Sequence, residues 1–459
     1  MRAKTGHTFT IVAVALFATK AAARFHTSVG GDAFFCLLFG RDVLERGLPH
    51  VNDMTTLGYG GWWIDAQWLA HLIFYGVYRV GGFPLCLVLV TTLEALGLAA
   101  ASWAAVRAGA SSVRVFMGTL AALTLLPSFT VMRAQAFAWP LLGLVLWLVV
   151  DDDRRPSRRL WWAVPLIALW TNLHGSALVG AGVVGLAALR TAIARPAQRL
   201  ERLALGAVAG AASLASPYWL PPYWWKMTTD AGPFVEWEAP TLLDDPQHVL
   251  LGALVLGGVA WRLRKLRTLD ALLLVVLALL GLRAVRYGLL LAFALAALGP
   301  GLLEAVIGPR SFAPRRVAPV VAFAGALFLG GVAFGAAVLD ERLAEKFPPE
   351  VARLPFEGGN VLATETYGDW LLFERPELRG RVLVDVRSEV ASYDDWVRLV
   401  RIDRGELDLI DDLPDVRHLL IDEARTRGLP DALAGDGRWA RLFGNARVSA
   451  WTRRVRRRR

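Results

Sequence analysis

The chain has 459 residues, a net charge of +10 and a mean hydropathy of +0.43, and 55% of its residues are hydrophobic. This composition excludes an ordinary soluble enzyme, and a total of two cysteines, Cys36 and Cys86, excludes a disulfide framework and a cysteine-based metal site. No nucleic-acid-binding motif accompanies the excess arginine, so we predict no nucleic-acid partner.

Hydrophobic runs separated by short charged loops recur from residue 8 to residue 339 and predict an all-α polytopic membrane domain. About eleven spans are expected. They are 8–24, 84–106, 114–132, 134–150, 160–173, 174–192, 202–217, 247–261, 269–282, 285–303 and 317–339. With the N-terminus in the cytoplasm, the arginine-rich loops all lie inside, as the positive-inside rule requires.

The same count places the first loop, 25–83, and the C-terminal residues 340–459 outside the cytoplasmic membrane. The count depends on residues 66–80, which are apolar enough to form a helix. A membrane crossing there would reverse the side of every later loop. The mixture of Trp68, His71, Tyr75, Tyr78 and Arg79 in this segment is typical of a helix that lies at the interface. We therefore predict a juxtamembrane helix there and no crossing.

Asp32 lies a few residues beyond the first span, surrounded by apolar positions that suit a helix along the membrane surface. A carboxylate in this place can bind a divalent cation or act as a base on an incoming hydroxyl. The alternative is a structural role, as a helix N-cap or as an ion-pair partner of Arg41.

Two predicted outer turns carry polar groups between apolar spans. Arg133 is suited to a bidentate grip on phosphate, or it reaches the interface as a long side chain at a span end. Asn172-Leu173-His174-Gly175 offers an amide donor and a titratable ring. His174 is a candidate general base, phosphate donor or metal ligand, and the alternative is a hydrogen bond that closes the turn.

The outer loop 217–246 is rich in Trp, Tyr and Pro, which are typical of an interfacial belt. Aromatic faces such as Trp237 also stack on sugar rings, and Glu236 or Glu238 is a candidate acid. Arg283 and Arg286 flank the next outer turn and form a second candidate phosphate clamp. Glu94, within a predicted span, is expected to form a hydrogen bond between helices.

From about residue 340 the hydropathy falls, and short β-like runs alternate with helical stretches. The runs are NVLATE, RVLVDVR and VRHLLIDE, and the helical stretches are DWLLFERPE and YDDWVRLVRI. They predict a small α/β domain without a glycine-rich phosphate loop or a nucleophile elbow. Asp385 and Arg387 are expected to pair with each other or to face the membrane domain.

The order of an Asp, a Gly-Arg helix, a Gly-rich turn, an aromatic-Trp-Leu helix and a Gly-Gly step resembles the first outer loop of the GT-C-fold glycosyltransferases. Protein O-mannosyltransferases and aminoarabinose transferases are among them. The closest likeness is to uncharacterised bacterial members with an Asn-Leu-His-Gly step, which is Asn172–Gly175 here. Further matching motifs are Arg133-Ala134-Gln135, Tyr367-Gly368-Asp369-Trp370-Leu371 and Asp385-Val386-Arg387.

The resemblance implies sugar transfer from a polyprenyl-phosphate carrier outside the membrane, with Asp32 as the first-loop acid and 66–80 as a helix that does not cross. It leaves the acceptor unnamed and makes Asp32 the candidate ligand of a divalent metal. The chain departs from the pattern at Gln67, where relatives often carry an acid, and at Gln135, where they carry His. Residues 115–150 also contain no carboxylate.

The leading hypothesis is an inverting GT-C glycosyltransferase with Asp32 and His174 as catalytic residues. Arg133, Arg283 and Arg286 would hold the donor phosphate, and Asn172, Glu236, Trp237 and Gln67 would contact substrate. The predicted transmembrane domain, residues 1–339, is expected to be surrounded by membrane lipid. A transporter of an anionic lipid and a non-catalytic envelope-polysaccharide assembly protein are the alternatives.

Overall fold

The computed structural model describes residues 8–126, 131–218, 237–310, 318–426 and 428–454. Contacts divide the chain into two compact units. The helical unit contains the described residues of 1–25, 84–223 and 234–336, and the mixed unit contains those of 26–83 and 337–459. The first loop is therefore grouped with the C-terminal residues.

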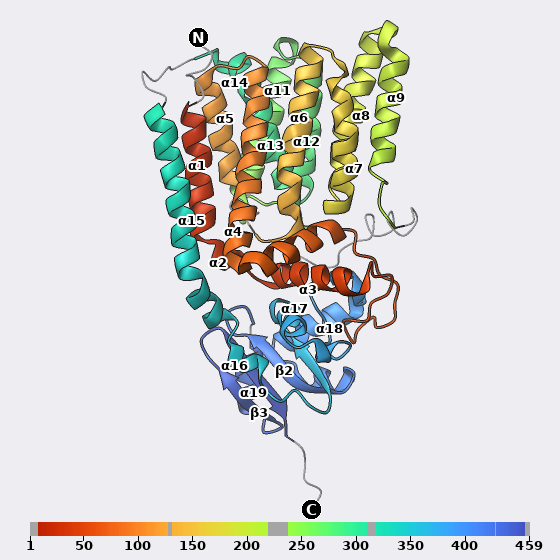
Figure 1. The fold of residues 1–459 in the computed structure, drawn as a ribbon, viewed down its shortest axis with the longest axis vertical. Coiled ribbons are helices and arrows are strands. Elements are labelled where there is room, and N and C mark those ends of the chain that lie inside the picture. The colour runs from red at the N-terminus through yellow and green to blue at the C-terminus, as the bar shows by residue number, and fades with distance from the viewer. Residues whose placement is uncertain (1–7, 127–130, 219–236, 311–317, 427, 455–459) are drawn as a thin grey trace, which may run out of the picture. The chain divides into compact units, whose positions relative to one another are not determined.

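The helical unit consists of helices that run side by side (Figure 1). They are α1 (Thr8–Ala23), the part of α4 (Trp68–Arg107) from Pro84 onward, α5 (Ser112–Leu125), α6 (Ala138–Arg154), α7 (Ala163–Leu173), α8 (Ala177–Ala194), α9 (Arg199–Ala212), α11 (Pro246–Arg262), α12 (Thr268–Arg283), α13 (Gly288–Ala297), α14 (Gly299–Ile307) and α15 (Ala318–Lys346) up to residue 336. Short 3-10 turns lie at Ala134–Phe137 (η2), Arg158–Trp162 (η3), Pro196–Gln198 (η4), Leu263–Lys265 (η6) and Val285–Tyr287 (η7).

Each predicted span coincides with helical residues, but the count of eleven crossings is not confirmed. In the described part of the chain, four helices are long and apolar enough to cross a membrane. A fifth qualifies if Val285–Ala297 and Gly299–Ile307, which meet at a bend of 54°, form one broken span. Large apolar side chains on the helix surfaces, such as Leu254, Leu279 and Leu329, are exposed, as expected for a multi-pass membrane protein facing lipid.

Small residues allow the helices of this unit to approach closely. A Cβ atom on Gly97 of α4 would lie 2.5 Å from the backbone of Trp139 in α6, and one on Gly143 would lie 2.5 Å from the carbonyl oxygen of Gly97. Because lipid supplies no hydrophobic driving force between helices, their association depends on the close van der Waals packing that such glycines allow. Glu94, one turn before Gly97, is fully buried, and neither carboxyl oxygen has a hydrogen-bond partner among the described residues. The predicted interhelical hydrogen bond of Glu94 is therefore wrong.

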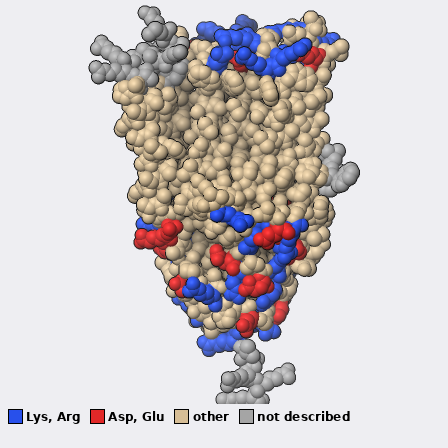
Figure 2. Space-filling view, viewed as in Figure 1, with Lys and Arg blue, Asp and Glu red and all other residues tan. Residues whose placement is uncertain are grey.

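One end of the helical unit is held by ion pairs between buried aspartates and arginines. Arg107 of α4 contacts Asp151 at 3.0 Å, and Arg202 of α9 contacts Asp152 at 3.0 Å. Arg190 of α8 contacts Asp153 at 2.9 Å, and Arg267, which precedes α12, pairs with the same carboxylate. Arg154 of α6 completes the set by contacting Asp270 of α12 at 2.6 Å. Figure 2 shows Lys and Arg gathered at this end, beside a broad belt without charged side chains on the visible face.

The juxtamembrane segment is separated from the span that follows it. Gly81 and Gly82 leave helical geometry, with Gly82 at a φ of 59°, so residues 68–80 are a helix distinct from the rest of α4. This first part belongs to the mixed unit, where it packs on α3 (Gly31–Arg46). A Cβ atom on Gly40 of α3 would lie 2.1 Å from the carbonyl oxygen of His71, so only glycine allows this contact. Residues 66–80 are thus not among the helices of the helical unit.

The mixed unit contains a four-stranded sheet in the order β1-β2-β4-β3. β1 (Asn360–Ala363) and β2 (Val416–Asp422) are parallel, whereas β4 (Val448–Arg453) is antiparallel to both β2 and β3 (Trp439–Gly444). The other elements are α2 (Phe25–Ser28), whose first residue belongs to the helical unit, α16 (Pro349–Ala352), α17 (Glu365–Glu374), α18 (Tyr393–Asp403), α19 (Leu429–Gly435) and 3-10 turns at Pro376–Leu378, Ser388–Val390 and Leu407–Asp412.

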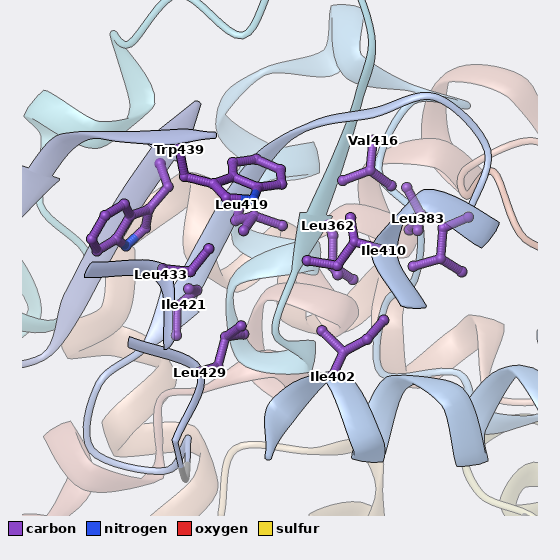
Figure 3. Packing of buried hydrophobic residues seen from close by; sticks show 12 residues of the cluster. Leu362, Leu383, Ile402, Ile410, Val416, Leu419, Ile421, Leu429, Leu433 and Trp439 are labelled. Carbon is purple, nitrogen blue, oxygen red and sulfur yellow. The ribbon is translucent and has the colours of Figure 1, made fainter. Parts of the chain in front are cut away.

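Figure 3 shows the core of this sheet, where Leu419 and Leu362 from the strands meet Ile402 of α18 and Leu433 of α19. The predicted strands at NVLATE and VRHLLIDE and both predicted helices are confirmed. RVLVDVR is not a full strand, because Val382 forms only isolated bridges, to Thr55 and Val361.

The first loop forms backbone hydrogen bonds with a segment of the mixed unit that lies far away in the sequence. Thr56 and Leu57 donate backbone hydrogen bonds to the carbonyl oxygens of Val382 and Leu383 at 2.8 and 3.1 Å. Gly58 then passes Val390 so closely that a Cβ atom would lie 2.0 Å from its carbonyl oxygen. The loop and the C-terminal residues therefore form one packed structure.

We expect Asp152→Asn to destabilise the protein by about 3 kcal/mol, because Asp152 and Arg202 are each only 4% exposed and the arginine would keep a buried, uncompensated charge. Asp151→Asn is the matched control, since its partner Arg107 is 32% exposed and surface pairs contribute at most about 1 kcal/mol. Thermal unfolding of the purified full-length protein measures the difference. Equal melting temperatures for the two variants would contradict the structural role of the buried pair.

Candidate functional site

The ion pairs of the helical unit determine which turns lie together. Arg154, Arg190 and Arg267 mark the charged ends of α6, α8 and α12, so the opposite ends of these helices lie at the other end of the unit. Those opposite ends carry Arg133, Asn172 to His174, and Arg283 to Arg286. The structure therefore brings the predicted polar turns of the helical unit to one end.

His174 closes the turn between α7 and α8 through its Nδ1 atom. The backbone N–H of Ser176 donates to Nδ1 over 3.1 Å, and the Ser176 hydroxyl lies 2.7 Å from it. The Trp170 indole in turn donates to the Ser176 oxygen over 3.2 Å. Because a backbone N–H can only donate, Nδ1 accepts, and the proton of the neutral ring is on Nε2. The predicted hydrogen bond that closes the turn is thus present, and it fits the tautomer with the proton on Nε2.

Asn172 joins the ends of two helices. Its amide nitrogen donates to the carbonyl oxygen of Ala168 at 2.9 Å and to that of Ala215, beyond α9, at 2.8 Å. Both amide hydrogens are therefore committed to backbone acceptors, which is a structural use of the side chain.

Arg133 precedes η2 in an extended conformation and is half-buried. The turn η2 contacts α7, the helix that ends in Asn172 and Leu173. Gln135 is buried, and its Oε1 atom has no hydrogen-bond partner among the described residues. The Arg133 turn is thus a packed structure with polar atoms held beside α7.

Arg286 stacks on an aromatic side chain at the third turn. Its guanidinium carbon lies 4.8 Å from the centre of the Trp237 ring, which packs edge-on against Tyr287 at 6.0 Å. Val285 also donates a backbone hydrogen bond to Glu238 over 2.9 Å. Trp237 and Arg286 therefore form one cluster. Arg283, the last residue of α12, is exposed. Glu236 lies outside the described residues.

Asp32 belongs to the mixed unit and lies half-buried in the first turn of α3. The N-cap of this helix is Gly30, so Asp32 is not the N-cap residue. Arg41 donates to the carbonyl oxygens of Phe373 and Leu372 at 2.9 and 3.2 Å and stacks on the Phe373 ring. The described hydrogen bonds of Arg41 are thus made to backbone carbonyl groups of α17 and not to Asp32.

Close backbone contacts at two glycines place the helix of Asp32 near the segments that carry Asp369 and Asp385. A Cβ atom on Gly31 would lie 3.2 Å from the carbonyl oxygen of Glu365, so the start of α3 lies against the start of α17. A Cβ atom on Gly368 would lie 2.5 Å from the carbonyl oxygen of Val384, so α17 also lies against the segment that carries Asp385. Asp369 follows Gly368 and is within electrostatic reach of Asp32, Asp385 and Arg387.

Asp385 and Arg387 form a closed, buried ion pair, which confirms one of the two predictions for them. The Nε atom of Arg387 contacts the two oxygens of Asp385 at 3.0 and 2.8 Å, and Nη2 contacts Oδ2 at 2.7 Å. Nη2 also donates to Asn52 over 2.8 Å. The guanidinium lies 4.9 and 4.5 Å from the ring centres of Phe39 and Trp63, so aromatic faces shield it from water.

Asp369 is fully buried and is not neutralised by hydrogen bonds. Its Oδ2 atom accepts the backbone N–H of Val386 over 3.0 Å, whereas Oδ1 has no partner among the described residues. Burial, and then the charge of Asp385, raise the pKa of Asp369 well above its ordinary value. Burial therefore favours the protonated, neutral form of Asp369.

Gln67 lies at the start of the helix 68–80, where its backbone N–H donates to Asp65 over 2.9 Å. The other oxygen of Asp65 lies 2.7 Å from Nδ1 of His71, and both side chains are buried. This pair ties the turn to the first turns of the helix. Asp65 thus has a buried partner, His71, that the sequence pattern did not indicate.

No group of three or more His, Cys, Asp or Glu side chains within the described ranges is placed to hold a metal ion.

The sequence pattern missed Asp369 as a neighbour of Asp32, because 337 residues separate them. A signal is nonetheless present: both follow a glycine, in Gly31-Asp32 and Gly368-Asp369, and both glycines lie at close backbone contacts. A Gly-Asp step within a helix that packs closely is thus a feature that the two sites share.

We expect Arg387→Met to destabilise the protein by about 3–5 kcal/mol, because Asp385 would keep a buried charge without a partner. Adding Asp385→Asn removes that charge and recovers part of the loss. A double-mutant cycle of thermal unfolding measures the coupling, and additive effects of the two substitutions would contradict it.

No family model and no curated protein of known function matches the chain by sequence. Solved structures do match it in fold. ArnT from Cupriavidus metallidurans in the apo state superposes with a TM-score of 0.52 at 16% identity, covering 96% of this chain and 97% of that one. The same protein bound to undecaprenyl phosphate gives 0.50 at 15% identity over 96% and 97% of the two chains.

The oligosaccharyltransferase of Archaeoglobus fulgidus in the apo form gives a TM-score of 0.50 at 12% identity, covering 92% of this chain and 72% of that one. Both neighbours are GT-C-fold glycosyltransferases. The identities are too low to carry activity across, but the coverage extends over nearly the whole chain. The likeness predicted from the first loop is therefore confirmed at the level of architecture: this multi-pass membrane protein has the GT-C fold.

Proposed function

We propose that the protein is a membrane glycosyltransferase that takes a sugar from a polyprenyl-phosphate donor on the outer face of the cytoplasmic membrane. The observation that carries the proposal is the gathering of Arg133, His174, Arg283 and Arg286 at the end of the helical unit opposite the ion pairs. Guanidinium groups and an imidazole N–H are suited to the oxygens of a phosphate. The neighbour bound to undecaprenyl phosphate supports a donor of this class.

In the proposed reaction, an acceptor hydroxyl attacks the anomeric carbon of the donor sugar. The new carbon–oxygen bond forms as the bond to the phosphate oxygen breaks, with inversion at carbon, and the polyprenyl phosphate leaves. Asp32 takes the hydroxyl proton as general base. Arg133, Arg283 and Arg286 stabilise the negative charge that develops on the leaving phosphate.

The hydrogen bonds of His174 refine its proposed role. Since Nδ1 accepts the backbone N–H of Ser176, the neutral ring carries its proton on Nε2 and donates from there. A general base would need Nε2 free of a proton. We therefore assign His174 to the donor phosphate and leave Asp32 as the single base.

We expect Asp32→Asn to lower the transfer rate by about 100- to 10,000-fold, the usual contribution of a general base. Sugar transfer from labelled polyprenyl-phosphate donors in membranes measures this effect. Full activity of the variant would exclude Asp32 as the base. Donor that crosses vesicle bilayers without sugar transfer would instead favour the transporter alternative.

Arg133→Ala, Arg283→Ala and Arg286→Ala should each weaken donor binding by roughly 10- to 100-fold, because a hydrogen bond to a charged group contributes about 1.5–3 kcal/mol. Arg264→Ala is the matched control, since this exposed arginine lies at the opposite end of the helical unit. An equal loss in the control would contradict a phosphate site in these turns.

His174→Gln and His174→Asn separate the two ring nitrogens. An Asn amide oxygen can accept the Ser176 N–H in place of Nδ1 but offers no donor at the Nε2 position, whereas the longer Gln amide can place a donor there. We expect Gln to retain tighter donor binding than Asn, measured as the KM for donor. Tighter binding by the Asn variant would contradict the role of Nε2.

A further inference from the structure

A buried acid lies beside the proposed base and has no assigned task. Asp369 projects from α17, and α3 lies against this helix through the contact of Gly31 with Glu365 and Thr366. Asp369 and Asp32 are thus placed on two helices in close backbone contact, within electrostatic reach of each other. Asp369 is completely buried, whereas Asp32 is half-buried.

The charged groups that face Asp369 come from each element packed against it. Asp32 comes from α3, and Asp385 and Arg387 come from the segment that follows Val384. Arg387 is committed to Asp385, to Asn52 and to two aromatic rings, so its hydrogen bonds described here do not extend to Asp369. Among the described contacts of the Asp369 carboxyl group, the Val386 N–H is the hydrogen-bond donor, and it reaches only Oδ2.

We propose that Asp369 is a positioning residue for Asp32: it remains a neutral carboxylic acid in the α3–α17 contact and so keeps this contact, and with it Asp32, in place. The proposal rests on the proposed function insofar as Asp32 is the base. The backbone N–H of Val386 on Oδ2 fixes the orientation of the Asp369 carboxyl group. The absence of a described donor on Oδ1 disfavours its ionised form.

The proton balance is simple. Asp369 keeps its proton throughout the reaction and does not exchange it with substrate, and the proton of the acceptor hydroxyl goes to Asp32. Ionisation of Asp369 at alkaline pH would place a second negative charge beside Asp32. That charge would loosen the contact of α3 with α17, which holds Asp32 in place.

Asp369→Asn tests this assignment, because an amide has the shape of a neutral carboxylic acid and still accepts the Val386 N–H. In a profile of transfer rate against pH, wild type should lose about tenfold per pH unit once Asp369 ionises, whereas Asp369→Asn should lack this alkaline decline. Asp431→Asn, at an exposed position in α19, is the matched control and should keep it. A purely structural role would lower the rate at every pH without moving the profile.

A second readout needs no sugar transfer. A carboxyl group whose pKa is raised by folding contributes stability that is complete below its unfolded pKa of about 4 and is lost as the pH rises through the folded value. The melting temperature of full-length wild type should therefore fall with rising pH relative to Asp369→Asn. Infrared spectra with carbon-13-labelled aspartate should show a protonated carboxyl band at neutral pH that Asp369→Asn removes.

The two readouts keep the two proposals apart. Parallel melting curves for wild type and Asp369→Asn, with no protonated band lost in the variant, would overturn the role of Asp369 even if the protein transfers sugar. Wild type that shows the band but transfers no sugar from any donor would overturn the proposed function while the protonation of Asp369 stands.

Discussion

The ion pairs of Asp151, Asp152 and Asp153 are the constraint on which the helical unit depends. Three consecutive residues of α6 bind arginines that belong to α4, α8 and α9 or precede α12. Apolar helices in lipid have little to determine their relative height, since one apolar surface packs nearly as well as another. Charges taken out of water accept only a paired arrangement. The pairs thus hold one set of helix ends level, and the polar turns at the opposite ends come together as a consequence.

The mixed unit uses the same chemistry for a different purpose. Arg387 and Asp385 neutralise each other beneath Phe39 and Trp63, whereas Asp369 has only one backbone donor described. The difference between these two buried aspartates is the presence of an arginine within hydrogen-bonding distance. Arg387 therefore offsets the charge of Asp385, whereas burial disfavours the charged form of Asp369, although only 16 residues separate the two aspartates.

Much of the architecture was predictable from the sequence, because hydrophobic length and the distribution of arginine report directly on helices in a membrane. Predictions failed where a residue depends on a distant partner. Glu94 was expected to form a hydrogen bond with another helix, but its carboxyl oxygens have no such partner within the described ranges. RVLVDVR was expected to be a strand, although Val382 forms only isolated bridges. His174 was recognised as important, but which ring nitrogen donates depends on Ser176 and Trp170 in three dimensions. The pairing of Asp32 with Asp369 depends on backbone contacts at Gly31 and Gly368, which periodicity does not report.

The hydrogen bond from Arg387 to Asn52 joins residues 335 positions apart, and the bridge from Val382 to Thr55 spans nearly as many. The first loop is synthesised early, but its partners emerge only after every helix of the helical unit has been made. Contacts of such high sequence separation form late, because the entropy of closing the intervening chain opposes them. In the half-formed protein, Thr55, Thr56 and Leu57 therefore lack their partners at Val382 and Leu383 throughout membrane insertion. A chain truncated before residue 382 therefore lacks these contacts of the first loop, however well its helices insert.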